Sequence, residues 1–161
     1  MILIRLAAAT LALLLPALSI AADPATPPAT TATPGDSAPM PVRVRVIKGS
    51  RQGPAALPPT MAPLKQQLSK LAYQRWEQLS ERNFTMTVGK TEFVDLPNGD
   101  HVALTVQETS GKNVTIEVAL AQRNTQSRLT IEKGQRIVHQ VSGEKGGVAY
   151  FVTVHVAPTG P

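Results

Sequence analysis

Basic side chains near the start of the folded part have the spacing of an anion-contacting row. Arg43 and Arg45 alternate with valines, so both project from one face of a predicted strand, and Lys48 and Arg51 follow just beyond. Such a row can dock an acidic envelope protein or an acidic surface polymer. Alternatively, the arginines protect an edge strand from unwanted strand addition. The sequence leaves both interpretations open.

Two aromatic residues are a second candidate binding site. Tyr73 and Trp76 lie close to Arg75 in the sequence, and their ring faces could stack on a sugar or another small molecule. The alternative is burial of both rings, because aromatic side chains contribute large apolar areas to protein interiors. The sequence therefore allows either a glycan-binding cleft or an aromatic core at these positions.

No motif for catalysis or metal binding is complete in this chain. Val88–Thr91 ends like a phosphate-binding P-loop, but Phe84 stands where that motif needs another glycine. The three histidines, His101, His139 and His155, lack the close spacing typical of metal ligands, and there is no Gly-x-Ser-x-Gly motif. Scattered carboxylates leave a cryptic hydrolase as a remaining hypothesis. We predict no catalytic residue, no metal site and no cofactor.

The composition narrows the classes of function further. The chain has no cysteine, which excludes disulfides, a thiol nucleophile and a lipid-modified N-terminal cysteine. Its formal net charge of +5 favours an acidic partner. Nucleic acid is not expected as that partner, because aromatic residues that could stack on bases make up only 4% of the chain.

The N-terminal region has the layout of an export signal followed by a tether. Arg5, an apolar run over 6–15 and small residues near Ala22 predict a secretory signal peptide over residues 1–22. The run is too short for a transmembrane span, so no membrane segment is expected after cleavage. Residues 23–41, rich in Pro, Ala and Thr, predict a disordered tether. We expect a periplasmic or secreted protein with one β domain over 42–158.

Alternating hydrophobic residues predict β-strands over most of this domain. The predicted strands cover residues 42–46, 84–88, 92–96, 102–106, 114–120, 129–131, 137–141 and 148–156. Asn98-Gly99 predicts a hairpin with a type I′ turn. The last strand is apolar on both faces, so we expect it to lie centrally in its sheet.

One amphipathic helix is predicted after a Pro- and Gly-rich loop. Its apolar stripe is formed by Met61, Leu64, Leu68 and Leu71. We expect about three turns that end near Ala72. Residues 73–79 fit either a continued helix or a strand, and their aromatic content favours a strand. The domain is thus predicted to be an antiparallel β-sandwich or open barrel of about eight strands with one short amphipathic helix.

Three motifs stand out within the β domain. The first, L-K-x-Q-L-x-x-L-x-Y-x-x-W, runs from Leu64 to Trp76, and the second, V-x-L-P-N-G, runs from Val94 to Gly99. The third joins Gly146-Gly147 to the apolar stretch 148–156. With the Pro-rich tether, they resemble small exported proteins of Gram-negative and related bacteria that have one Leu-rich helix and a β domain. The resemblance covers most of 42–158 and implies export and fold, without an assigned activity.

These observations together predict a non-enzymatic, exported envelope protein. Its β domain would bind a partner or assist assembly, with the tether giving reach. A module that binds a glycan or a small molecule is the alternative.

Overall fold

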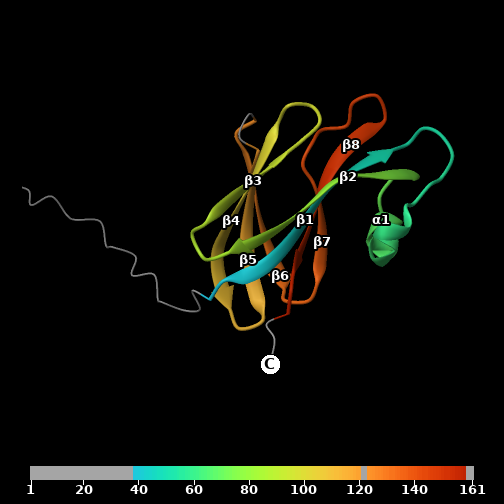
Figure 1. The fold of residues 1–161 in the computed structure, drawn as a ribbon. Coiled ribbons are helices and arrows are strands. Elements are labelled where there is room, and N and C mark those ends of the chain that lie inside the picture. The colour runs from blue at the N-terminus through green and yellow to red at the C-terminus, as the bar shows by residue number, and fades with distance from the viewer. Residues whose placement is uncertain (1–37, 121–122, 159–161) are drawn as a thin grey trace, which may run out of the picture. The chain divides into compact units, whose positions relative to one another are not determined.

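The computed structural model describes residues 38–120 and 123–158, which form eight strands and one short helical segment (Figure 1). The predicted signal peptide and residues 23–37 of the predicted tether lie outside the described residues. The strands are β1 (Met40–Ser50), β2 (Arg75–Met86), β3 (Thr91–Asp95), β4 (His101–Ser110), β5 (Asn113–Leu120), β6 (Thr125–Glu132), β7 (Arg136–Gln140) and β8 (Val148–Val156). The helical segment consists of the 3₁₀ helix η1 (Pro59–Leu64) and α1 (Lys65–Leu68). Within the described ranges, no helix is long and apolar enough to cross a membrane.

The strands form two four-stranded antiparallel sheets. Sheet A has the order β2-β1-β8-β7, and sheet B has the order β3-β4-β5-β6. This arrangement confirms the predicted fold class of a mainly β protein with eight strands and one short helix. It also confirms the central position predicted for the last strand, because β8 lies between β1 and β7.

The main hydrophobic core lies between the two sheets. Alternate residues of each strand point into it, as the period of two along a strand requires. Sheet A contributes Val42, Val44, Val46, Val152, Val154 and Val156. Sheet B contributes Val102, Leu104, Val106, Val114, Ile116 and Val118. Each fully buried aliphatic side chain stabilises the fold by about 1.5–3 kcal/mol.

The helical segment builds a second core on the outer face of sheet A, the face turned away from sheet B. Its buried members are Ile47, Met61, Leu64, Leu68, Trp76, Ala149 and Phe151. Gly49 lets the aromatic rings approach β1, because a Cβ there would lie 2.9 Å from Trp76, 3.0 Å from Tyr73 and 3.1 Å from Phe151. Sheet A therefore buries apolar side chains on both faces.

The helix is shorter than the sequence predicts. The α-helical part ends at Leu68 instead of near Ala72, and the preceding turn is a 3₁₀ helix. The Ser69 hydroxyl donates to the Gln66 carbonyl at 3.1 Å, while the Lys70 N–H donates to Gln67 at 3.3 Å. The hydroxyl thus occupies the carbonyl to which a continuing α-helix would bond, which is how serine competes with helix formation.

Residues 75–86 form one long strand where the sequence predicted two. β2 pairs with β1 along its whole length, with a register shift opposite Val46 and Ile47. Ser80 pairs with Val46 and Gln78 pairs with Ile47, so Leu79 is an extra residue in β2. This bulge lets a single strand continue through a stretch whose apolar alternation is broken. The strand prediction over 73–79 is confirmed from Arg75 onward.

The β3–β4 hairpin has a different turn from the predicted type I′. The Gly99 N–H donates to the Leu96 carbonyl at 3.0 Å, and the Leu96 N–H donates to Asp100 at 2.8 Å. Gly99 has a φ of +83°, whereas Asn98 has no positive φ. The turn is a type I turn followed by a glycine bulge, because Pro97 has the fixed φ that suits the first central position.

Candidate functional site

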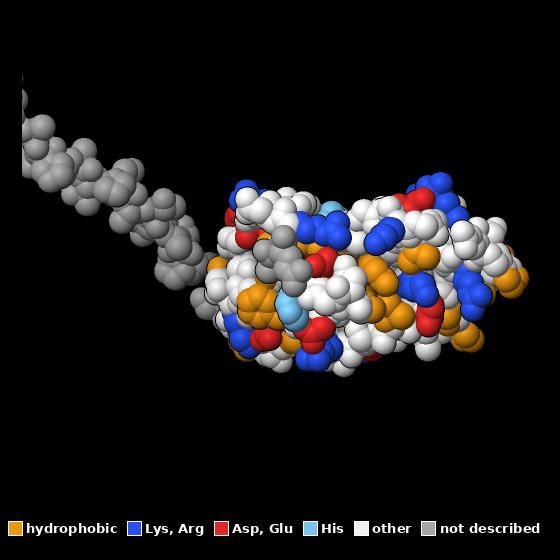
Figure 2. Space-filling model, turned by 90° about the horizontal axis from the view of Figure 1, so that it is seen from above, with side chains coloured by type: hydrophobic (Ala, Val, Ile, Leu, Met, Phe, Trp, Pro, Cys, Tyr) orange, Lys and Arg blue, Asp and Glu red, His pale blue; other side chains and the backbone are white. Residues whose placement is uncertain are grey.

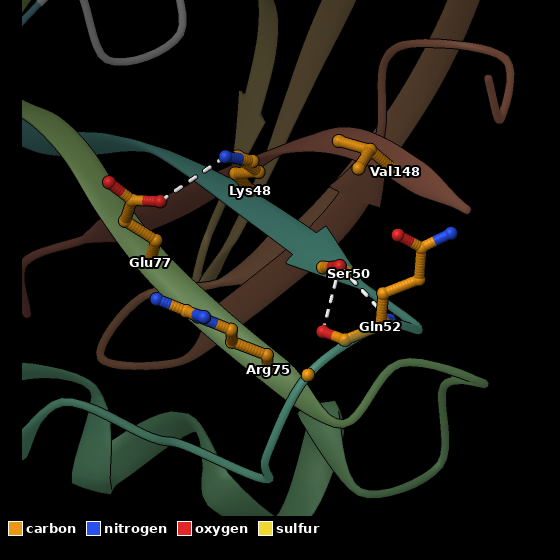
Figure 3. Close-up of a pocket in the computed structure, with 7 residues that line it drawn as sticks. Lys48, Ser50, Gln52, Arg75, Glu77 and Val148 are labelled. Carbon is orange, nitrogen blue, oxygen red and sulfur yellow. Dashed lines mark hydrogen bonds and ion pairs between the residues drawn. The ribbon is translucent and has the colours of Figure 1, made fainter. Parts of the chain in front are cut away.

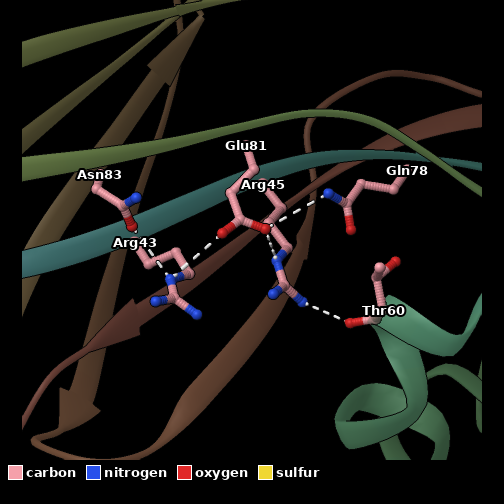
Figure 4. Close-up of polar contacts among 6 residues, drawn as sticks. All are labelled: Arg43, Arg45, Thr60, Gln78, Glu81 and Asn83. Carbon is pink, nitrogen blue, oxygen red and sulfur yellow. Dashed lines mark hydrogen bonds and ion pairs between the residues drawn. The ribbon is translucent and has the colours of Figure 1, made fainter.

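The predicted basic row begins on the outer face of sheet A, where Glu81 of β2 contacts both arginines (Figure 4). The Arg45 Nε donates to Glu81 Oε2 at 2.6 Å, and the Arg43 Nε lies 3.4 Å from Glu81 Oε1. Arg45 also donates to the Thr60 carbonyl at 2.9 Å, and its side chain is only 14% exposed. Arg45 therefore helps to hold the helical segment, and Arg43, 47% exposed, is the more open end of the row.

The predicted role of these arginines in protecting a sheet edge is wrong. β1 is hydrogen-bonded to β2 on one side and to β8 on the other, so it is an inner strand. An inner strand has no free row of backbone groups to protect. The alternation of Arg and Val was correctly interpreted as a two-faced strand, but alternation carries no information about a strand's position in the sheet.

Trp76 lies in the second core, and the half-buried Tyr73 packs against it. Trp76 is 5% exposed and packs edge-to-face, with its ring centroid 5.7 Å from that of Tyr73 and 5.3 Å from that of Phe151. This packing leaves no open ring face of Trp76 for stacking on a sugar. The Tyr73 hydroxyl donates to Glu144 Oε2 at 2.9 Å, and burial and this carboxylate raise the Tyr73 pKa.

Arg51, the last residue of the predicted row, ties the β7–β8 loop to the second core. One guanidinium nitrogen lies 2.9 Å from Glu144 Oε2, and the guanidinium carbon lies 5.5 Å from the Tyr73 ring centroid. The Arg51 N–H also donates to the Gly147 carbonyl at 2.9 Å. These contacts hold the β7–β8 loop, which carries Lys145. Arg51 therefore positions Lys145 and is not itself part of the hollows.

Lys48 lies an odd number of residues from Arg43 and Arg45 on β1, so it faces the opposite side of the sheet. It lines a hollow at the end of β1 (Figure 3). The hollow has a volume of about 390 Å³. Across neighbouring strands the Lys48 Nζ lies 3.4 Å from Glu77 Oε2, and Arg75 lies two residues before Glu77 on β2. The hollow is also lined by Ser50, Gln52, Gly53 and Val148.

A second hollow of about 410 Å³ adjoins the first, because Lys48 and Val148 line both. Arg123, between β5 and β6, and Lys145, in the β7–β8 loop, bring further positive charge to it. The Arg123 Nε lies 3.5 Å from an oxygen of the buried Asp100 carboxylate. Its remaining lining residues are Asn98, Ser142, Gly143 and Tyr150. We call the two hollows together the Lys48 groove.

The Lys48 groove carries an excess of positive charge. Its cationic side chains are Lys48, Arg75, Arg123 and Lys145, and Glu77 is the one carboxylate among its described lining residues. No described carboxylate forms an ion pair with Arg75 or Lys145. Viewed from above, Lys and Arg side chains are interspersed with hydrophobic ones and with several Asp and Glu side chains (Figure 2). A groove with an excess of cationic side chains attracts anionic ligands.

A third hollow continues from the second towards β6 and β7. It has a volume of about 270 Å³ and shares Arg123, Ser142 and Gly143 with the Lys48 groove. His139 lines it, and burial lowers the His139 pKa. This histidine is therefore neutral at pH 7, so the third hollow is polar and adds little charge to the Lys48 groove.

The described residues contain no cluster of three or more His, Asp or Glu side chains that could hold a metal ion. The His101 Nδ1 lies 2.7 Å from Asp95 Oδ1 on the exposed side of the β3–β4 hairpin. His139 lies in β7, and His155 lies on the outer face of β8 opposite Arg43. The three histidines are thus on different parts of the fold.

Of the proposed binding residues, the structure brings only Lys48 into the groove. Arg75 was noted only as a neighbour of Tyr73 and Trp76, and Arg123 and Lys145 were not singled out, since the three come from separate segments that converge only in the fold. Strand parity was a usable signal for Lys48. It shares the parity of Val42, Val44 and Val46, so it faces opposite to Arg43 and Arg45.

The fold and the site define a two-sheet β-sandwich with a basic groove at one end. No match to this chain was found among protein-family models, curated proteins or solved structures. The resemblance to exported bacterial proteins stays a prediction, and any functional conclusion depends on the geometry of the groove.

Proposed function

We propose that this chain is a non-catalytic, exported binding module that holds an acidic polysaccharide of the cell envelope in the Lys48 groove. The observation that carries the proposal is the joining of two hollows of about 390 and 410 Å³ through Lys48, with Arg75 and Lys145 free of ion pairs among the described residues. Cations without a carboxylate partner can contact a ligand without first breaking an internal ion pair.

The polar lining favours a polysaccharide over an acidic peptide. Ser50, Gln52, Asn98 and Ser142 offer hydroxyl and amide groups, which match the many hydroxyls of a sugar chain. The apolar contribution comes mainly from Val148 and the half-buried Tyr150. A groove for peptide side chains would instead need deep apolar pockets for anchor residues.

The proposal also rests on the predicted export of the chain. A protein that meets an envelope polysaccharide must be periplasmic or secreted, which the predicted signal peptide over 1–22 would achieve. Fractionation of the native cells, followed by N-terminal sequencing, should find a mature chain in the periplasm or medium that begins just after Ala22. An intact Met1 on a cytoplasmic chain would contradict the export half of the proposal.

The binding half is tested by calorimetric titration with polygalacturonate, an acidic sugar polymer. We expect the double variant Arg75→Gln/Lys145→Gln to weaken binding at least about tenfold, since each charge-assisted hydrogen bond contributes about 1.5–3 kcal/mol. The matched control is Lys112→Gln/Arg128→Gln, which removes the same charge from the β4–β5 turn and from β6. Added salt should weaken binding to the unaltered chain.

Three outcomes would contradict this function. Equal losses in the two double variants would mean that net charge, rather than the groove, attracts the polymer. Tighter binding of polyglutamate than of polygalacturonate would indicate an acidic protein partner instead. Binding of neutral dextran with the same affinity as polygalacturonate would show that the cationic side chains do not contribute to binding.

A further inference from the structure

A second group of cations lies on the outer face of sheet A, opposite to the face of Lys48. The strand register places Arg136 of β7 beside His155 of β8, His155 beside Arg43 of β1, and Arg43 beside Asn83 of β2. Side chains at such cross-strand positions have Cβ atoms about 4.5–5.5 Å apart, and like charges there are destabilising. This row therefore places up to three positive charges next to one another.

The described residues compensate only part of this charge. Glu81 contacts Arg43 and Arg45, and no described carboxylate pairs with Arg136. Burial lowers the pKa of His155, and the charges of Arg136, Arg43 and Arg45 lower it further. The row thus keeps its histidine neutral and retains an excess of positive charge.

A small cavity opens at the centre of this row. It has a volume of about 100 Å³ and lies between Arg43, Asn83 and His155. Pro41, Val42 and Ala157 complete its walls. The cavity is about a quarter of the size of either hollow of the Lys48 groove, which suits a tetrahedral oxyanion better than a sugar ring.

Hydrogen-bond donors remain available at the wall of this cavity. The Arg43 Nε donates to Asn83 Oδ1 at 3.1 Å, which leaves the two terminal guanidinium nitrogens and the Asn83 amide nitrogen without a partner among the described residues. When the His155 ring is protonated, both of its nitrogens are hydrogen-bond donors.

We propose that this cavity binds a phosphate group through Arg43, Asn83 and protonated His155, with Arg136 adding positive charge from the neighbouring strand. A phosphate group offers several acceptor oxygens and carries between one and two negative charges near neutral pH. Bound phosphate relieves the repulsion along the row and favours the charged form of His155. Protonation of His155 therefore strengthens phosphate binding as the pH falls, while protonation of the phosphate itself opposes this gain.

The charged groups around His155 come from the two neighbouring strands, β1 and β7. Arg43 and Arg45 face it from β1 and Arg136 from β7, while Glu81 of β2 contacts the two β1 arginines. The arginines stay charged over this range. Protonation of His155, together with that of phosphate itself, therefore governs the pH profile.

The test is an NMR titration of the His155 ring protons in the full folded chain, with inorganic phosphate as the probe. We expect phosphate to raise the His155 pKa, because a bound anion stabilises the imidazolium. Arg43→Gln should weaken phosphate binding about tenfold, and Arg136→Gln should weaken it less. Arg128→Gln, on β6 of the other sheet, is the matched control and should leave binding unchanged.

The source of the phosphate is distinguished by a second arm with vesicles that contain phosphatidic acid. Binding of inorganic phosphate supports a free-anion site, and binding of these vesicles alone supports a lipid headgroup as the ligand. The proposal is overturned if neither probe moves the His155 pKa. It is equally overturned if Arg128→Gln reduces the shift as much as Arg43→Gln. Neither result depends on polysaccharide binding in the Lys48 groove.

Discussion

The two faces of sheet A bury apolar side chains by different means. The inner face presents three valines at alternate positions of β1 and three of β8, and the second sheet covers them. The outer face buries a compact cluster around Trp76 and Phe151, under a helical segment with a single α-helical turn. Beyond this cluster, the same face carries the row formed by Arg136, His155 and Arg43.

This difference shows how one sheet can serve both stability and binding. The inner face is covered over most of its length, and its polar continuation at Lys48 becomes part of a groove. The outer face is covered only where Gly49 lets aromatic rings approach the backbone. The uncovered remainder is therefore free to hold charged side chains.

The largest expected effect compares neighbouring residues of β8 on the two faces. Phe151→Ala should lower the free energy of unfolding by about 3–5 kcal/mol, because it removes a fully buried ring from the second core. Val152→Ala, facing the main core, should cost about 2 kcal/mol, the equivalent of about two buried methylene groups. Urea denaturation of both variants measures the two values. A smaller loss for Phe151→Ala would mean that the outer face contributes little to stability.

The next comparison removes the same side chain from each core. Leu64 and Leu104 are both fully buried, Leu64 under the helical segment and Leu104 between the sheets. Leu104→Ala should cost about 2–5 kcal/mol and speed amide exchange throughout the strands. Leu64→Ala should cost about 2 kcal/mol, with faster exchange confined to residues 59–71, because few hydrogen bonds hold this segment. Uniformly faster exchange in Leu64→Ala would show that the two cores unfold together.

A smaller effect is expected from filling the space that Gly49 leaves. In Gly49→Ala the new Cβ would lie within 2.9–3.1 Å of three aromatic rings, so the second core must shift. Overpacking of this kind costs about 1–3 kcal/mol. Gly143→Ala is the matched control, since the nearest atom to its Cβ would be 3.8 Å away. Thermal unfolding should separate the two variants, and equal melting temperatures would show that the rings move aside freely.

The smallest effect concerns the two histidines with lowered pKa values. In the unfolded chain both histidines bind protons as the pH falls through their ordinary pKa of 6.5, whereas in the folded chain their pKa values are lower. The stability of the fold should therefore decrease as the pH drops from 7 to 5. Burial alone lowers the His139 pKa, whereas burial and arginine charges lower that of His155. Added salt should therefore weaken the pH dependence due to His155 more than that due to His139. Urea titrations of His139→Gln and His155→Gln measure each share.

Local patterns predicted the strands well because alternation has a direct structural meaning. Val42, Val44 and Val46 had to share a face, and the doubly apolar stretch 148–156 had to be central. The length of the helix was overestimated. A 3₁₀ helix followed by one α-helical turn is enough to place Met61, Leu64 and Leu68 on one buried side, so the apolar spacing does not require three α-helical turns.

The candidate site was mostly beyond prediction from local patterns. Arg75, Arg123 and Lys145 meet through sheet pairing and loop placement, which no spacing in the sequence encodes. The neutralisation of Arg45 by Glu81 depends on cross-strand register, and a bulge at Leu79 shifts that register by one residue. Lys48 was predicted to belong to the same row as Arg43 and Arg45, but it faces the other side of the sheet. Its even spacing from Val42, Val44 and Val46 could have shown this from the sequence.

The placement of Trp76 gives this protein a built-in optical probe. It is the one tryptophan of the chain, and it is packed edge-to-face between Tyr73 and Phe151 in the second core. Its intrinsic fluorescence therefore reports on the second core alone, and its emission is blue-shifted while the helical segment is docked. Far-ultraviolet circular dichroism reports on the strands of both sheets. The two signals can follow the release of the helical segment separately from the unfolding of the sandwich.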